Sequence, residues 1–238
     1  GFAQQGYPLF QDLNGMAEQD SEQIYAAVLQ VIAELSAQVS PEQIIALSFS
    51  SAMHSLIVLD QHQQPLTRCI TWADNRAAAA GQWLAAQPEA EELYQRTGVP
   101  NHPMTPLAKI IWLRQEQPKL FAQAAYFISI KEYIFLQLFG ELIVDYSIAA
   151  SSGMLNLAQL AWEQSALNLA GISSKQLSQV VATTHQLTRL AENLRLKLGL
   201  SAACRFIVGS SDGCLANLGI GALDEQSVAL TIGTSGAL

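Results

Sequence analysis

Apolar residues along the chain alternate between the spacing typical of helices and the short runs typical of buried strands. A first helix is predicted from apolar positions three or four residues apart: Ile24, Val28, Val31, Leu35 and Val39. Asp20 or Ser21 would supply its N-cap. Short apolar runs between polar stretches predict strands over 44–49, 56–59, 69–72, 126–129, 141–145, 205–209 and 227–232.

Helical segments are expected between these strands. The pattern predicts helices over 74–87, 89–97, 107–117, 131–139 and 212–223, and a largely helical stretch over 157–200 with polar breaks. Gly98 is placed to end the second of these helices, and the three prolines within 99–106 predict a loop. Because strands and helices interleave along the chain, we expect an α/β fold.

Composition narrows the class of protein. Half of the 238 residues are apolar, and 20 acidic side chains outnumber 12 basic ones for a net charge of −8. The absence of a basic run argues against nucleic acid and anionic membranes as partners. No apolar stretch is long enough to span a bilayer, no secretory signal pattern is present, and three scattered cysteines form neither a disulfide framework nor a metal pair. We therefore expect a soluble, cytoplasmic protein.

Both ends of the chain suggest a longer protein. The sequence begins with Gly1 rather than Met, and it ends at Leu238 just after a glycine-rich stretch that follows a predicted strand. Such a stretch usually leads into another element of the same sheet. We expect the chain to be part of something longer.

Polar residues follow three of the predicted strands, where α/β proteins place their sites. Segment 50–55 presents His54 among small hydroxyl residues, either as a β-turn with a surface histidine or as a loop that binds a polyol. In segment 71–76, Asp74 is a credible helix N-cap, but Trp72, Asp74 and Arg76 together also suit a sugar. In segment 209–213, Asp212 is either an N-cap or a carboxylate that takes a proton from a hydroxyl.

A glycine-rich stretch forms the fourth candidate. Gly233, Thr234, Ser235 and Gly236 follow a predicted strand and could hold a phosphate with backbone N–H groups. The spacing and the lysine of a Walker A loop are missing, so this signal is weak by itself.

The order and the residue sequences of these segments resemble those of the FGGY family of carbohydrate kinases, and within it the gluconate kinases. The matching segments are 47–56, 70–76, 102–104, 130–133, 144–149, 211–213 and 232–236. The resemblance runs through nearly the whole chain and is least diagnostic over 157–200. Xylulose kinases share a Met-His pair and a similar Trp-Asp-Arg stretch, whereas the wording of 71–76 is closer to gluconate kinases.

The resemblance implies an actin-like, ribonuclease-H-like ATPase fold that is incomplete in this chain. Residues 1–203 would form most of the sugar-binding N-terminal domain, and 204–238 would begin the C-terminal ATP-binding domain. The family's first strand and phosphate loop should lie upstream, and most of the adenosine pocket downstream. By this reading the chain alone should not be an active kinase.

The resemblance also assigns roles. It implies phosphorylation of D-gluconate to 6-phosphogluconate by ATP, with Mg²⁺ and with Asp212 as the general base. Met53, His54, Trp72, Asp74 and Arg76 would bind the sugar, and 233–236 would bind nucleotide; no residue is assigned as a metal ligand. Candidate cations for the gluconate carboxylate are Arg76, His54, His102 and Lys131, of which Lys131 could instead simply open a helix.

Other functions stay open at this point. The protein could phosphorylate another sugar such as xylulose. In different classes, it could be a sugar-acid-binding module without catalysis, or an actin-like structural ATPase. The presence of Asp212 argues against a sugar-acid-binding module without catalysis, and the predicted sugar-binding residues argue against a structural ATPase. A homodimer is possible.

Overall fold

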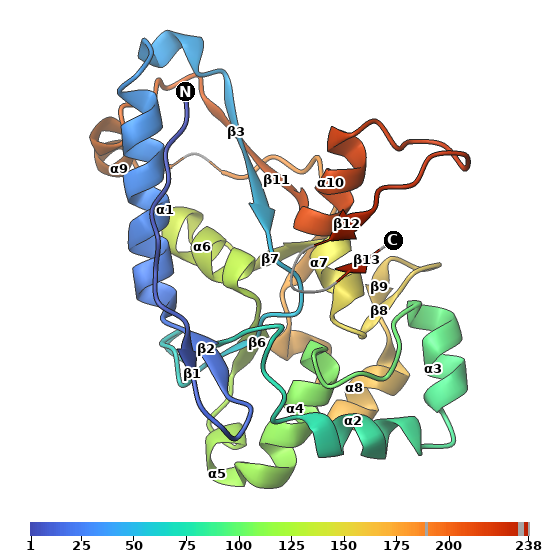
Figure 1. Cartoon of the computed structure of the whole chain (residues 1–238). Helices are drawn as coiled ribbons and strands as arrows, with labels where there is room; N and C mark the ends of the chain where they lie inside the picture. The colour runs from blue at the N-terminus through green and yellow to red at the C-terminus, as the bar shows by residue number, and fades with distance from the viewer. Residues whose placement is uncertain (189, 233–235, 238) are drawn as a thin grey trace.

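The computed structural model describes residues 1–188, 190–232 and 236–237. It has the α/β architecture that the sequence predicts, with helices packed against short strands in two groups (Figure 1). In the described part of the chain the longest helix is α1 (Ser21–Ser36), and no helix there combines the length and apolarity needed to cross a membrane.

The described residues contain two parallel strand pairs. Strand β3 (Ala46–Ser51) pairs with β11 (Arg205–Ser211) in the upper half of Figure 1, and β7 (Ile143–Asp145) pairs with β10 (Gln179–Val181). The register of β3 and β11 shifts between Ile207 and Ser210, which marks a bulge. The predicted domain boundary after residue 203 stays a prediction, and β11 beyond it pairs with β3 before it.

The remaining strands pair antiparallel. Strands β1 (Phe10–Gln11), β2 (Ala17–Gln19) and β5 (Cys69–Ile70) form one small sheet. The other antiparallel pairs are β4 (Ile57–Leu59) with β6 (Tyr126–Ile128), β8 (Leu155–Asn156) with β9 (Ala161–Trp162), and β12 (Thr231–Ile232) with β13 (Gly236–Ala237).

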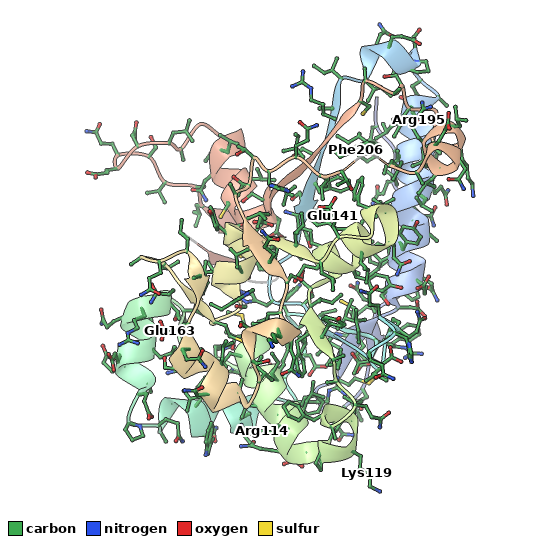
Figure 2. The ribbon with its side chains drawn as sticks, turned by 180° about the vertical axis from the view of Figure 1, so that it is seen from behind. Arg114, Lys119, Glu141, Glu163, Arg195 and Phe206 are labelled. Carbon is green, nitrogen blue, oxygen red and sulfur yellow. The ribbon has the colours of Figure 1, made fainter. Side chains whose placement is uncertain are left out.

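One hydrophobic core lies where α1 and α6 (Ile130–Phe139) cover β3 and β11 (Figure 1). Its aromatic rings meet edge-on, with the Phe49 ring 5.3 Å from that of Phe135 and 6.2 Å from that of Phe139. Phe206 of β11, labelled in Figure 2, lies 5.1 Å from Phe139 by ring centroids. These contacts fix α6 against both parallel strands.

A second core surrounds α4 (Pro106–Glu116), whose residues 106–113 are all buried. Helices α2 (Ala78–Ala85) and α8 (Gln164–Ala170) pack against it, and the short α5 (Pro118–Phe121) follows it. Helix α3 (Ala90–Thr97) is joined to the start of α8 by an ion pair between Arg96 and Glu163, with Nη1 and Oε1 3.0 Å apart. Figure 2 shows Glu163 beside these two helices. Over residues 106–113 helix α4 has no exposed face, as expected for a helix that other elements cover on all sides.

Caps set several helix ends where the sequence predicts them. The Asp20 carboxylate accepts N–H bonds from the first turn of α1, and Gly98 ends α3 in the left-handed conformation with φ 69°. The Ser129 hydroxyl and the Glu132 carboxylate form a capping box at the start of α6. The remaining short elements are α7 (Tyr146–Ser151), α9 (Glu192–Lys197), α10 (Asp212–Gly219) and the 3₁₀ turns Pro41–Gln43 and Ser174–Gln176.

Three sequence predictions differ from the structure. The helix expected from residue 74 begins at Ala78: the Asp74 carboxylate accepts the backbone N–H groups of Arg76 and Ala17, and residues 76–77 form a turn before the helix. The prediction that 157–200 is mainly helical is wrong, because this stretch contains β9, α8, β10 and α9 joined by turns. The strand expected over 227–232 is reduced to β12.

Burial raises the pKa of the Glu132 carboxyl from 4.5 to about 7, and the hydrogen bonds that it accepts from Ser129 only partly offset this. The folded state thus binds a proton more tightly than the unfolded chain. The resulting stabilisation is complete below pH 4.5 and is lost as pH rises through 7.

We expect Glu132→Gln to flatten the pH dependence of stability between pH 5 and 8. Glutamine keeps an oxygen that can accept from the Ser129 N–H but does not ionise. Urea unfolding at several pH values measures this, with the exposed Glu116→Gln as the control that should follow the wild type. Parallel pH curves for wild type and Glu132→Gln would contradict the expectation.

Candidate functional site

The candidate site lies where β3 and β11 end side by side. Parallel strands end at the same edge of a sheet, and here Ser51 is the register partner of Ser211. The loop that carries Met53 and His54 follows β3, and Asp212 follows β11 as the first residue of α10. The structure therefore brings together two segments that lie far apart in the sequence.

A glycine makes this arrangement possible. Gly209 has φ 70° within the bulge of β11, and a Cβ there would collide with the carbonyl oxygen of Phe49 in β3. Only glycine has no Cβ and adopts this conformation without strain. The bulge changes the direction of the last residues of β11 just before Asp212, as bulges near functional sites commonly do.

Met53, His54 and Asp212 lie close together at this edge. A Cβ on Gly213 would lie 3.1 Å from Cε of Met53, so the first turn of α10 reaches that side chain. Asp212 is exposed, and its Oδ1 accepts the Gly213 N–H at 2.8 Å. Burial lowers the pKa of His54, and the Asp212 carboxylate partly opposes this by raising it.

The backbone and ring of His54 are both held firmly. His54 has a left-handed conformation with φ 65°, which is uncommon for a residue with a Cβ. Its Nδ1 lies 2.8 Å from the carbonyl oxygen of Ser151. Because a carbonyl oxygen only accepts, Nδ1 carries the proton, and Nε2 is the acceptor of the neutral ring.

A cavity of about 380 Å³ opens beside these loops. Its lining includes Met53 and Trp72 of the predicted sugar-binding residues but not His54 or Asp212, and its polar members include Lys131 and several serine, threonine and glutamine side chains. Trp72 is 47% exposed, so one part of the indole is available for stacking. The cavity has the apolar surface and the few polar groups that suit a small polyol.

Lys109 is a residue of this region that sequence reasoning missed. It comes from the buried helix α4 and is 0% exposed, and its ammonium donates to the carbonyl oxygens of His54 at 2.6 Å and Thr71 at 2.7 Å. Burial lowers its pKa to about 8. A lysine in the middle of a wholly apolar run was the signal that could have found it. Lys109 ties the two loops together.

Asp74 and Arg76 lie away from the cavity. Asp74 is 1% exposed, and its Oδ2 accepts the Ala17 N–H at 2.9 Å and the Arg76 Nη2–H at 2.8 Å. The Arg76 guanidinium also pairs with Glu18, and its Cζ lies 4.7 Å from the ring centroid of Trp112. Their role in sugar binding stays a prediction, while these contacts fasten the segment after Trp72 to β2.

The other candidate cations are also placed. Lys131 is buried at the start of α6, and its Nζ lies 2.7 Å from Oδ2 of buried Asp145. The exposed His102 accepts the Met104 N–H at its Nδ1, and its charge contributes to lowering the pKa of His54. Lys131 thus both opens a helix and lines the cavity, with its charge already balanced by Asp145.

The predicted nucleotide-binding residues are mostly beyond what the structure describes. Gly233, Thr234 and Ser235 lie outside the described residues, and Gly236 is the register partner of Ile232 in the pair β12–β13. Within 1–188, 190–232 and 236–237, no three His, Cys, Asp or Glu side chains gather as a metal site.

We expect Arg76→Lys to lower the free energy of unfolding by about 1–3 kcal/mol, because one ammonium cannot reproduce the paired bonds of the guanidinium to Asp74 and Glu18. Urea unfolding checks this, with the exposed Arg68→Lys as control. The sugar-binding role predicts something else: a rise of about tenfold or more in the KM for gluconate, with stability and the KM for ATP unchanged.

Comparison with known proteins gives the family. The model of the N-terminal domain of the FGGY family of carbohydrate kinases matches residues 1–219. Gluconokinase of Bacillus subtilis is 43% identical over 233 residues, which cover 98% of this chain and 45% of that protein.

Two solved structures from Lactobacillus acidophilus, one described as a gluconate kinase and one as a ligand-bound xylulose kinase, each match with a TM-score of 0.93 and 40% identity. Each match covers 98% of this chain and 47% of theirs. The chain thus spans about half the length of these relatives. It belongs to the FGGY family of carbohydrate kinases and has the actin-like ATPase fold of that family.

Proposed function

We propose that the protein phosphorylates D-gluconate with ATP to give 6-phosphogluconate. The observation that carries the proposal is the meeting of Met53, His54 and Asp212 at the shared end of β3 and β11, next to a cavity of sugar size. The 43% identity to a gluconokinase supports the choice of substrate.

In this proposal Asp212 is the general base. It takes the proton of the 6-hydroxyl while that oxygen attacks the γ-phosphorus of ATP and ADP leaves. Its exposed carboxylate at the first position of α10 suits the role, because it is open to a ligand and held by the helix start. The sugar carbons would lie against Trp72, and Met53 would bound the other side.

Of the four candidate cations for the gluconate carboxylate, only Lys131 lines the cavity, and among the described residues His54 and His102 are the two without a balancing carboxylate. The charges of Arg76 and Lys131 are already balanced by buried carboxylates. Nε2 of His54 and the exposed ring of His102 have no such partner among the described contacts. A histidine that gains a proton on binding an acid would favour gluconate over a neutral sugar.

By the resemblance to the family, segment 233–236 would bind the phosphates of ATP. Mg²⁺ would arrive with ATP, and among the described residues no three His, Cys, Asp or Glu side chains gather to hold it. Mg²⁺ commonly keeps several waters and binds through substrate phosphates and one or two carboxylates. Its contribution would be to neutralise phosphate charge.

Xylulose is the second candidate substrate. One of the two solved structures at 40% identity is described as a xylulose kinase. A neutral ketose would use the same cavity and the same base but would gain nothing from a protonated histidine.

We expect Asp212→Asn to lower kcat at least about 10²-fold while the KM for gluconate changes only a few-fold, because the amide keeps the shape but cannot take the proton. The measurement is steady-state kinetics on the protein expressed from its complete gene. The exposed Glu225→Gln serves as a matched loss of charge and should retain activity. Near-wild-type turnover by Asp212→Asn would refute the role.

A substrate panel tests the proposed specificity. We expect kcat/KM for gluconate to exceed that for xylulose, ribulose and glycerol by at least about tenfold, the scale of one charge-assisted hydrogen bond. ADP release measures all four sugars under identical conditions. A higher kcat/KM for xylulose would move the assignment to the second candidate.

A further inference from the structure

Ser147 occupies the centre of a hydrogen-bond network below the start of α10. Its hydroxyl donates to Oδ1 of Asp145 and accepts from the Ser210 hydroxyl at 2.9 Å and the Ser211 backbone N–H at 2.8 Å. A serine hydroxyl has one donor and two acceptor positions. All three are used here, so the group has a single orientation.

The network is anchored on its other side by a buried ion pair. Asp145 Oδ2 accepts from Lys131 Nζ at 2.7 Å, and its Oδ1 also accepts the backbone N–H of Ser147 at 3.0 Å and of Ile148 at 3.3 Å. Asp145 is therefore fixed by α6 and by the first turn of α7. Hydrogen bonds to an ionised, fully buried group are stronger than those between neutral groups.

The two groups that Ser147 holds lie directly before Asp212. Ser211 is the N-cap of α10, and its hydroxyl accepts from the Cys214 N–H, so its backbone sets the direction in which the helix starts. The bulge at Gly209 interrupts the regular pairing with β3 just upstream. Ser147 thus supplies a fixed point at the place where the register of the strand changes.

We propose that Ser147 is a positioning residue for Asp212, linking the Lys131–Asp145 pair to the cap of α10 so that the carboxylate faces the cavity edge. The proposal rests on the proposed function, in which Asp212 is the general base. Ser147 is not one of the residues that line the cavity, and its described hydrogen bonds go to Asp145, Ser210 and Ser211, through which it acts.

The first test is kinetic and uses the protein expressed from its complete gene. We expect Ser147→Ala to lower kcat about 10–100-fold, the effect of a small misplacement of a reacting group, with the KM for gluconate and for ATP within about threefold. Ser147→Thr keeps a γ-hydroxyl and should restore most of the activity.

Ser152→Ala is the matched control. This hydroxyl follows the same helix and is more buried than that of Ser147, but it bonds to Ala149 and Met154 and not to β11. A merely structural role for Ser147 predicts that both alanine variants lose stability without a selective loss of kcat. That result would overturn the proposal.

The second test does not need activity. Burial lowers the pKa of the His54 ring, and the Ser151 carbonyl and the charges of Lys109, His102 and Asp212 also act on that pKa. NMR titration of His54, assigned by its loss in His54→Gln, should show a lower pKa in Asp212→Asn. We expect Ser147→Ala to move the His54 pKa part of the way in the same direction, and Ser152→Ala to leave it unchanged.

The two tests separate the two ideas. If the wild type fails to phosphorylate gluconate and the His54 titration responds as expected, the proposed substrate is wrong and the positioning role stands. If His54 titrates identically in Ser147→Ala and in the wild type, Ser147 does not position Asp212, whatever the activity of the protein.

Discussion

The parallel pairing of β3 with β11 is the interaction on which the site depends. It joins strands separated by most of the chain and places the loop after β3 next to the helix after β11. Phe49 and Phe206, one from each strand, bury their rings against Phe139 of α6, so the pairing is sealed by the core beneath it. Loss of this register would move His54 away from Asp212 even if both side chains kept their local conformations.

Charged side chains buried around the site hold the loops that carry the polar groups. Lys109 bonds to the backbone of two loops, Lys131 pairs with Asp145, and Asp74 holds both Arg76 and the backbone of β2. Removing a charge from water is costly, and a neutral core of the same shape would often be as stable. These groups therefore make sense as devices that fix loop geometry. Loops without regular hydrogen bonds have few other ways to be held in place.

The sequence predicts those parts of the fold that local patterns determine. The strands β3, β4, β6 and β11 and the helices α1, α4 and α6 lie close to their predicted positions, because apolar periodicity and capping residues act within a few residues. The stretch 157–200 was mispredicted since its short elements pack on distant partners that no local pattern reveals. Asp74 shows the same limit: its carboxylate has a strong N-cap signal and accepts the Arg76 N–H, yet it also bonds to the distant Ala17 N–H and the helix begins only at Ala78.

Local sequence patterns identify the candidate site residues but not the residues that hold those side chains in place. His54 and Asp212 could be selected because polar residues at strand ends are conspicuous, and Met53 through the resemblance to the family; the structure brings all three to one edge. Ser147 could not, because a serine after an aspartate has many ordinary explanations, and the one signal for Lys109 was a charged residue inside an apolar run. What distinguishes them is a set of partners far away in sequence: two loop carbonyls for Lys109, and the end of β11 for Ser147. A side chain whose function is to connect distant segments acquires it only when those segments meet, so the structure is where such a residue can first be recognised.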